Sequence, residues 1–395
     1  MNNFNTLVIG RGLVGTAAAK YLSSMQEKVA VIGPDEPTDY DQSLVFASHY
    51  DQARLQRMIG KDDVWTRLNV DSVGQYEGIQ QQSGINFHNP VGCLYVNPAG
   101  RDGYLERATA LNNRFQLPFK SYSKGAEITR DFGDFNFPSN AEGLFEASPA
   151  GFINPRLLQK AQQKIFEQQG GVVVKDTALE VRWIDHAFQV TTHKGNRYCA
   201  QKVLLAAGAF TNFFNLIPKK IALTLKSEAV LLVKVSEAMA IKLAQLPSLL
   251  YEIDDGATEG IYLIQPVQYP DGAYYLKMGC NMPEDIYFDR IEQVQDWFRK
   301  GDSDRFAARL TAALSLILPG IAISETLTKR CIISRSIHGR PYIGEHERAG
   351  LFIAAGCNGY SAMCSDAIGS VAAQLIVHGA IPMDYARDSF EIIYQ

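Results

Sequence analysis

The sequence predicts an α/β fold in which a Rossmann-type dinucleotide-binding domain carries an inserted α+β domain built on an antiparallel sheet. Patterns of strand, Gly-rich turn, helix and strand follow one another over residues 6–33. Short apolar strands return at 172–174 and 203–207, and residues 351–378 again combine a strand, a Gly-bearing loop and a helix. Two β-rich stretches separate these regions, so we expect the parallel sheet to be assembled from segments far apart in the sequence.

The opening segment carries the pattern of a dinucleotide-binding turn. Apolar residues 7–9 predict a buried strand, the Gly-Arg-Gly-Leu-Val-Gly turn occupies 10–15, and a helix at 16–24 leads to a second strand at 29–32. In such a turn the first glycine permits the bend, the second lets the backbone approach a pyrophosphate, and the third lets the helix pack closely on the strand. We therefore expect cofactor contacts from Gly10, Gly12, Leu13, Val14 and Gly15.

The second strand ends without the acidic residue that usually binds ribose hydroxyls. Gly33 occupies that position, followed by Pro34, Asp35 and Glu36. Asp35, Glu36 or a backbone group could bind the ribose from the loop. This departure weakens the interpretation that the chain binds a nicotinamide cofactor. It weakens less the interpretation that the chain binds a dinucleotide held by the protein along more of its length.

The remaining patterns divide the chain into two expected domains. Residues 52–82 have a polar helical pattern, and Asn154 and Pro155 predict the start of a helix that reaches residue 169. Strand-like alternation at 229–235 and 273–278, with an amphipathic helix near 291–299, indicates the inserted domain. The expected dinucleotide-binding domain comprises residues 1–85, 146–215 and 326–395, and the expected substrate-binding domain comprises 86–145 and 216–325.

Composition limits the class of partner. The 395 residues include 38 Lys and Arg against 42 Asp and Glu, a net charge of −4, which does not favour nucleic acid or an anionic membrane. We find no apolar run of about 18 residues that would span a bilayer. The six cysteines form no Cys-x-x-Cys pair, which predicts no metal site and favours a cytoplasmic location.

Four further motifs accompany the Gly-rich turn. They are Ser-His-Tyr-Asp-Gln-Ala-Arg-Leu-Gln-Arg at 48–57, Leu-Lys-Met-Gly at 276–279, the stretch 331–344 ending in Gly-Arg-Pro-Tyr-Ile-Gly, and Phe-Ile-Ala-Ala-Gly at 352–356 with its following helix. In this order and spacing the chain resembles the D-amino-acid oxidase superfamily of flavoproteins, and within it the monomeric sarcosine oxidase and glycine oxidase branch.

The resemblance implies a Rossmann-type FAD-binding domain and a substrate domain on a large antiparallel sheet. It also implies oxidation of the C–N bond of an amine or amino acid. Hydride would pass from the carbon beside the nitrogen to flavin N5, the imine would be hydrolysed, and O2 would be reduced to H2O2. The implied partners are thus FAD, a small-molecule amine or amino acid, and O2, with the oligomeric state left open.

Two basic candidates for catalysis follow from the resemblance. Strand alternation puts Lys277 on one face with Tyr275 and Gly279. The resemblance implies that Lys277 lies over the flavin, where its charge would assist oxygen reduction; the alternative is a solvent-facing lysine. Arg54 would lie near the flavin and Arg57 would bind a substrate carboxylate, on one face if the segment is helical; the alternative is a surface pair.

The other implied site residues surround the same flavin. Tyr262 lies on a strand that could line the substrate pocket, and Met363 stands where the family has a second carboxylate-binding lysine, which leaves open a substrate without a carboxylate. Cys331 falls where some members attach FAD through a thioether, although a core cysteine is the alternative. The last helix is expected to begin near residue 359 with its positive end toward the flavin. The remaining cofactor candidates are Gly356, Gly359, Tyr360 and Ser361.

Three other functions remain open from the sequence. A same-fold amine dehydrogenase would pass electrons to a quinone or a protein acceptor. A nicotinamide-dependent Rossmann dehydrogenase would need no flavin. A flavin-binding subunit without its own chemistry is the third alternative.

Overall fold

The computed structural model describes residues 2–98, 103–254 and 258–395. Two large β-sheets organise these residues, and the site described below lies between them. The two sheets draw on alternating stretches of the chain, as the separated sequence patterns predict.

The first sheet has eight strands and a parallel centre. Its parallel strands are β9 (Val172–Val174), β2 (Val29–Ile32), β1 (Asn2–Ile9), β12 (Arg197–Leu205) and β20 (Leu351–Ala355). Its antiparallel additions are β10 (Ala178–Ile184), β11 (Ala187–Thr192) and β19 (Tyr342–Glu345). The central strands are buried on both faces because helices cover one face and loops and strands cover the other.

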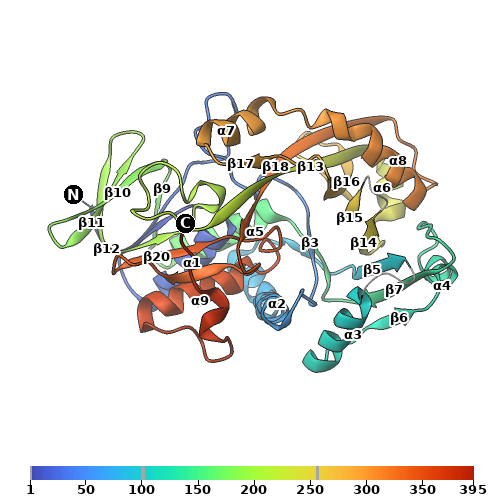
Figure 1. The fold of residues 1–395 in the computed structure, drawn as a ribbon, viewed down its shortest axis with the longest axis horizontal. Coiled ribbons are helices and arrows are strands. Elements are labelled where there is room, and N and C mark those ends of the chain that lie inside the picture. Colours follow the sequence, from blue (N-terminus) through green and yellow to red (C-terminus); the bar gives the residue numbers. More distant parts are fainter. Residues whose placement is uncertain (1, 99–102, 255–257) are drawn as a thin grey trace.

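Three helices pack on this sheet, α1 (Leu13–Met25), α5 (Pro155–Gln168) and α9 (Ser365–His378), and α2 (Asp63–Ser83) packs on α5 and α9. Side chains of β1 alternate between its two faces. Val8 joins the helix-facing core with Leu22, whereas Leu7 packs on the opposite face with Phe188. Figure 1 shows α1 and α9 together below the strands at one end of the molecule.

The second sheet has nine strands and is antiparallel except where β5 pairs with β14. Its path runs through β17 (Tyr287–Phe288), β13 (Leu223–Val235), β16 (Tyr274–Asn281), β15 (Glu259–Gln268), β14 (Ser248–Asp254), β5 (Cys93–Pro98), β7 (Ala141–Glu146) and β6 (Lys120–Tyr122), and β18 (Glu325–Ser336) also pairs with β13. In Figure 1 the long strands β13 and β18 of this sheet run from the middle of the molecule toward the end where α8 lies. A small third sheet of β3 (Arg54–Gln56), β8 (Gly151–Ile153) and β4 (His88–Asn89) is hydrogen-bonded to neither and packs against β15.

The other helices are shorter. They are α3 (Tyr104–Phe115), α4 (Gly125–Asp131), α6 (Glu237–Leu243), α7 (Ile291–Lys300) and α8 (Ala307–Ile317), with 3₁₀ turns η1 (Gly208–Phe210), η2 (Asp304–Phe306) and η3 (Arg387–Phe390). Helices α4, α6 and α8 contribute to a large apolar core on the second sheet, for example through Ile128, Leu243 and Leu314.

Most predicted elements are confirmed, and two details are wrong. The helical interpretation of 52–82 fails for 52–62, because residues 54–56 form β3 against β8 and the helix begins only at Asp63. The last helix begins at Ser365 rather than near 359, because a turn occupies the residues between. Strand β18 pairs with β13, so most of 326–336 belongs by hydrogen bonding to the second sheet and not to the first. The division into two functional domains remains a proposal.

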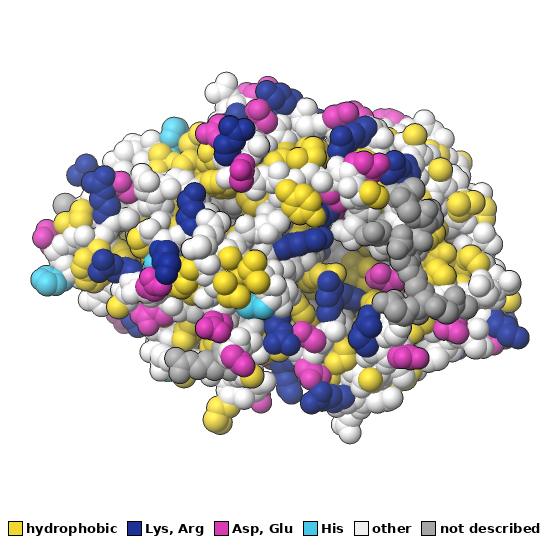
Figure 2. Space-filling model, viewed as in Figure 1, with side chains coloured by type: hydrophobic (Ala, Val, Ile, Leu, Met, Phe, Trp, Pro, Cys, Tyr) yellow, Lys and Arg dark blue, Asp and Glu magenta, His cyan; other side chains and the backbone are white. Residues whose placement is uncertain are grey.

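Three observations on the described residues bear on the expected partners and on the cysteines. None of the helices in the described ranges is long and apolar enough to cross a membrane. In Figure 2 Lys and Arg side chains are interspersed with Asp and Glu over the visible face, without a large patch of one sign. All six cysteines are free thiols.

Candidate active site

A cavity of about 340 Å³ opens where the carboxyl ends of β1, β2 and β12 meet the second sheet. Carboxyl ends of parallel strands are the usual ligand edge of an open α/β sheet. The wall includes the Gly-rich turn, residues 45–50, the end of β12, and residues from β13, β14, β15 and β18. The cavity therefore joins the Rossmann-type sheet to the antiparallel sheet.

The glycines of the turn have distinct reasons to lack a side chain. Gly10 has φ +113°, and a Cβ there would lie 2.2 Å from the carbonyl oxygen of Ala206. A Cβ on Gly15 would lie 1.7 Å from the carbonyl oxygen of Gly10. At Gly12, by contrast, the nearest atom is Nδ1 of His49 at 3.9 Å. The backbone of Gly12 is therefore open to the cavity at the start of α1, where a pyrophosphate would gain from backbone N–H groups.

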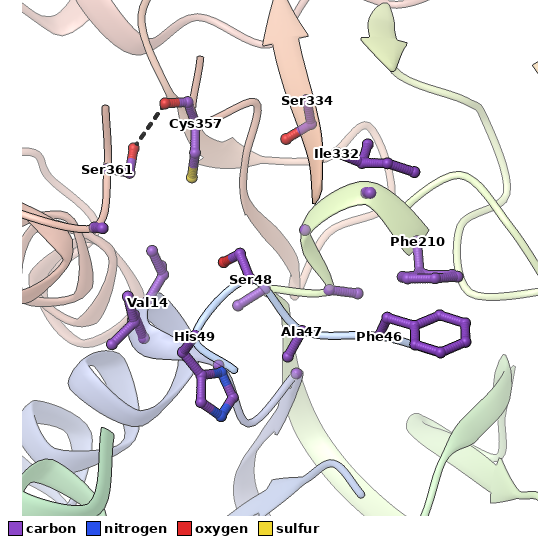
Figure 3. Close-up of a pocket in the computed structure, with 18 of the residues that line it drawn as sticks. Val14, Phe46, Ala47, Ser48, His49, Phe210, Ile332, Ser334, Cys357 and Ser361 are labelled. Atoms are coloured by element: carbon purple, nitrogen blue, oxygen red, sulfur yellow. Dashed lines mark hydrogen bonds between the residues drawn. The ribbon is translucent and has the colours of Figure 1, made fainter. Parts of the chain in front are cut away.

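His49 lies beside this turn and is buried. Burial is the largest cause that lowers the pKa of His49, to about 3, and Arg11 and Arg156 act in the same direction. The imidazole is therefore neutral at physiological pH, and its buried Nδ1 has no hydrogen-bond partner in the described chain. Figure 3 shows His49 and Ser48 in a loop next to Val14, with Ile332 on the far side of the cavity.

The end of β2 shows why Gly33 replaces the expected acidic residue. A Cβ on Gly33 would lie 2.5 Å from Cβ of Arg11, whose Nε donates to the carbonyl oxygen of Gly33 at 3.0 Å. The Arg11 guanidinium also pairs with Asp35, and Arg156 pairs with Glu36. Gly33 lines the cavity, whereas neither predicted ribose-binding carboxylate does.

Asp51 holds two basic candidates. Its Oδ2 accepts a hydrogen bond from Lys277 Nζ at 2.6 Å and also pairs with Arg54, while its Oδ1 accepts from the Tyr269 hydroxyl at 2.7 Å. Lys277 also donates to the carbonyl oxygen of Ala53 at 2.8 Å. Burial lowers the pKa of Lys277, and the neighbouring Arg54 acts in the same direction. Arg54 lines the cavity and Lys277 does not.

Tyr262 separates Lys277 from the cavity. Lys277 Nζ lies 5.5 Å from the centroid of the Tyr262 ring, and that ring faces the cavity. Gly279 makes room for the ring, because a Cβ there would lie 2.3 Å from the Tyr262 hydroxyl oxygen. Tyr262 on β15 and Gly279 on β16 are cross-strand partners. Lys277 is thus a buried cation directly behind an aromatic wall.

Arg57 is a buried cation that lines the cavity. Its Nη1 donates to the Tyr104 hydroxyl at 3.2 Å, and its guanidinium lies 5.7 Å and 5.5 Å from the ring centroids of Tyr95 and Tyr360. Its Nε has no hydrogen-bond partner, and no described carboxylate lies within ion-pair distance. A buried guanidinium with free donors is a strong site for an anion, above all a carboxylate.

The last turn completes the cavity. Gly359, Tyr360, Ser361 and Met363 line it, and the Ser361 hydroxyl donates to the Cys357 carbonyl oxygen at 3.1 Å, as drawn in Figure 3. Met363 is 5% exposed, and its side chain makes this part of the wall apolar. Cys331 lines the cavity from β18.

The cavity brings together most of the predicted site residues. Gly15, Gly356 and Lys277 do not line it; Gly15 and Gly356 lie in the supporting backbone at α1 and after β20. In the described ranges no group of three or more His, Cys, Asp or Glu side chains is placed to hold a metal ion. The predicted residues on the cavity wall are Gly10, Gly12, Leu13, Val14, Arg54, Arg57, Tyr262, Cys331, Gly359, Tyr360, Ser361 and Met363.

Sequence reasoning missed three polar residues here. His49 and Asp51 stand in the quoted motif at 48–57, but their burial becomes visible only in the fold. Glu228 lies within an otherwise apolar strand pattern and lines the cavity with 6% of its surface exposed. The signal in the sequence that could have identified Glu228 was a charged residue beside an apolar strand pattern.

The residues present fit a dinucleotide cofactor that continues from the Gly-rich turn toward the second sheet. Gly12 leaves space at the helix start, the unpaired Nδ1 of His49 lies beside it, and Cys331 and Tyr262 extend the wall onto the antiparallel strands. This extent exceeds a phosphate site alone and suits a long, partly aromatic cofactor.

Comparison with known proteins agrees with this geometry. Residues 5–375 match the model of the family described as FAD dependent oxidoreductase (DAO). Monomeric sarcosine oxidase from Bacillus sp. (strain NS-129) is 21% identical over 386 residues, covering 97% of this chain and 95% of that protein. NikD, an amino acid oxidase of nikkomycin biosynthesis, superposes with a TM-score of 0.78 at 18% identity over 100% and 98% of the two chains.

L-proline dehydrogenase from P. horikoshii shares the fold as well, with a TM-score of 0.74, 18% identity, and coverage of 97% and 95% of the two chains. The family match spans most of the sequence. The cavity carries the Gly-rich turn that binds the pyrophosphate of a dinucleotide cofactor such as FAD. The chain therefore belongs to the family of FAD dependent oxidoreductases, and FAD is its cofactor.

Proposed function

We propose that this enzyme oxidises the C–N bond of an amino acid, primary or N-alkylated, and passes the electrons to O2. The observation that carries the proposal is Arg57, a 4%-exposed guanidinium on the cavity wall with a free Nε and no carboxylate partner among the described residues. A buried cation without an ion-pair partner is stabilised by an anionic ligand, and a carboxylate matches the planar donor geometry of the guanidinium. The sarcosine oxidase and NikD similarities support the same class of reaction.

The flavin, when bound, supplies the chemistry by accepting a hydride from the carbon beside the substrate nitrogen. The protein has to orient the substrate and exclude water. Arg57 would bind the carboxylate, with Tyr104 fixing the guanidinium. Tyr262, Tyr360 and Met363 offer an apolar wall for the substrate carbon atoms. Because Met363 replaces a second cation, Arg57 alone would carry the carboxylate.

Lys277 would assist oxygen reduction from behind Tyr262. A buried cation stabilises negative charge that develops nearby, because little water screens it. Asp51 and the Ala53 carbonyl hold its ammonium in one position. The alternative is a dehydrogenase that does not react with O2, and two features favour it. The Asp51 carboxylate offsets the charge of Lys277, and the Tyr262 ring lies between Lys277 and the cavity.

Cys331 would attach the flavin covalently. Its free thiol lies on the cavity wall, on the sheet opposite the Gly-rich turn. The Cys331 carbonyl oxygen accepts from Trp297 Nε1 at 2.8 Å, which fixes the backbone at this position.

Oxygen consumption tests the proposal. The FAD-loaded enzyme should consume O2 and release peroxide with one or more members of a panel of primary and N-methyl amino acids. Amines of the same shape without a carboxylate should react far more slowly. Flavin reduction without peroxide, together with turnover of an artificial acceptor, would replace the oxidase proposal with the dehydrogenase.

A further inference from the structure

Glu228 is the only carboxylate among the described residues of the cavity wall. It lies on β13, directly across from Cys331 on β18, and two residues before Val230, which also lines the cavity. Val230 in turn pairs with Gly279, the residue that supports the Tyr262 ring. Glu228 therefore faces the cavity from the same sheet surface as Tyr262 and Cys331.

A second carboxylate already neutralises the lysine beside Glu228. Lys226 is 2% exposed; its Nζ makes a short ion pair with Asp285 and a longer contact of 3.2 Å with Oε2 of Glu228. Oε1 of Glu228 accepts no hydrogen bond within the described chain. Lys226, Asp285 and Glu228 thus place two carboxylates around one ammonium. The acceptor left without a donor is Oε1 of Glu228, a residue of the cavity wall.

This environment brings the pKa of Glu228 close to neutral pH. Burial is the main cause that raises the pKa of Glu228 to about 7, and the nearby Asp285 adds to it, while Lys226 acts in the opposite direction. A carboxyl group with a pKa near the working pH can both accept and release a proton. Two other titratable cavity residues are poorly suited, since burial lowers the pKa of His49 to about 3 and raises that of Tyr262 well above its ordinary value.

We propose that Glu228 binds the ammonium group of the substrate and removes its proton, so that the neutral amine is the species oxidised. The N–H bond breaks, the electron pair stays on nitrogen, and the proton moves to Oε1 of Glu228. With Arg57 for the carboxylate, the cavity offers one partner for each charge of a zwitterion. The substrate class is then a zwitterionic amino acid whose nitrogen is still basic. This inference rests on the proposed function.

The proton transfer is needed because hydride loss from carbon requires the nitrogen lone pair, which an ammonium lacks. The charged and titratable groups around Glu228 set its response to pH. They are Lys226 on its own strand, Asp285 after β16, Lys277 and Cys280 on β16, Tyr262 on β15, and Cys331 and Arg335 on β18.

The test compares wild-type enzyme with Glu228→Gln and Asp285→Asn by anaerobic rapid mixing with the amino acids that reduce the wild-type flavin. In wild type, the ratio of the reduction rate constant to the apparent Kd should rise with pH through an acid limb near neutrality. Glu228→Gln should lose that limb and fall by about 10²-fold or more near pH 7. The deficit should shrink above the pKa of the amine, where the free substrate is already neutral. Asp285→Asn should keep the limb and move it to lower pH, because a like charge has gone.

An infrared measurement reads the same group without substrate. The FAD-loaded wild-type enzyme should show a carboxylic-acid carbonyl band that disappears on raising the pH through neutrality. All three proteins carry Glu146→Gln, because the pKa of the buried Glu146 is also raised, to about 6. In this background Glu228→Gln should lack the band and Asp285→Asn should retain it. An unchanged acid limb or an unchanged band in Glu228→Gln would overturn the inference while leaving amino-acid oxidation intact. Failure of every amino acid to reduce the wild-type flavin would overturn the proposed function, and this inference with it.

Discussion

Asp51 and Lys277 are joined by a 2.6 Å ion pair that links the loop before β3 to the middle of β16. The two residues are 226 positions apart, and both are buried. Because Asp51 also pairs with Arg54, one carboxylate fixes a cavity-lining cation and a cation behind the wall. The lysine is therefore held in place but not exposed to the substrate.

Lys277→Met should slow reoxidation of the reduced flavin by O2 about 10²-fold and change anaerobic flavin reduction much less. The fold should tolerate the change, because Asp51 keeps Arg54 and Tyr269 as partners. Rapid mixing of the reduced enzyme with O2 measures the effect. Lys234→Met, at a lysine on β13 whose side chain is 42% exposed, is the matched control and should leave the rate unchanged. Equal reoxidation rates in wild type and Lys277→Met would exclude the proposed role.

Arg57→Gln should raise KM for amino acids by about 10²-fold, since the buried guanidinium would no longer meet the substrate carboxylate. Any residual turnover of the corresponding amine without a carboxylate should stay within a few-fold of wild type. Steady-state oxygen consumption with both substrates measures the difference. A parallel loss for both substrates would mean that Arg57 supports the site structurally through Tyr104 and Tyr360.

Gly12→Ala should fold normally and lose FAD affinity by about tenfold or more, because the new methyl group meets no protein atom closer than 3.9 Å yet projects toward the cofactor. Titration of the flavin-free protein with FAD, in a Cys331→Ser background that removes the proposed covalent bond, measures the affinity. Gly74→Ala, in the middle of α2 with open space around it, is the control and should leave binding unchanged while stabilising the protein by about 0.5–1 kcal/mol. Unaltered FAD affinity in Gly12→Ala would contradict the assignment of this turn to the pyrophosphate.

Cys331→Ser should release the flavin on acid precipitation, whereas wild type should retain the yellow colour in the pellet. Cys357→Ser is a matched control because Cys357 also lines the cavity. Absorbance of pellet and supernatant gives the answer directly. Colour released from the wild-type protein would return Cys331 to the role of a simple wall residue.

Glu146 should make stability fall as pH rises. Burial raises its pKa to about 6, against the hydrogen bonds that it accepts from Tyr95 at 2.5 Å and Ile59 N at 3.1 Å. Because the folded state holds this proton more tightly than the unfolded chain, the contribution is present below the unfolded pKa and is lost as pH rises through about 6. Relative to Glu146→Gln, wild type should lose about 2 kcal/mol of unfolding free energy between about pH 4 and pH 7.

Denaturant unfolding at several pH values measures this difference. Glu142→Gln, at an exposed position on the same strand, should follow the wild-type pH dependence. A constant difference between wild type and Glu146→Gln across this range would show that the carboxyl does not titrate there.

The sequence predicts the framework of this fold because its signals are local. The apolar run at β1, the Gly-rich turn and the small-residue helix α1 follow directly from neighbouring residues. The cap of α5 is also local, since Asn154 Oδ1 accepts from the Leu157 amide at 3.1 Å. By contrast, residues 54–56 become a strand only through pairing with β8 about 100 residues later, which no local pattern reveals.

The chemistry of the site depends on such distant contacts even more. Lys277 is recognisable as a candidate from its motif, but Asp51 and the Tyr262 ring decide how it can act. Glu228 has no motif at all; its raised pKa arises from burial and from Asp285, 57 positions away. Residue types could be predicted here, whereas their protonation and access required the fold.

Amino-acid oxidation is best tested by anaerobic mixing of the FAD-loaded enzyme with primary and N-methyl amino acids. At least one of them should bleach the flavin absorbance in a single turnover, and admission of O2 should restore it with release of peroxide. The matching amine without a carboxylate should react far more slowly. Absence of bleaching with every amino acid, in a protein that binds FAD stoichiometrically, would contradict amino-acid oxidation.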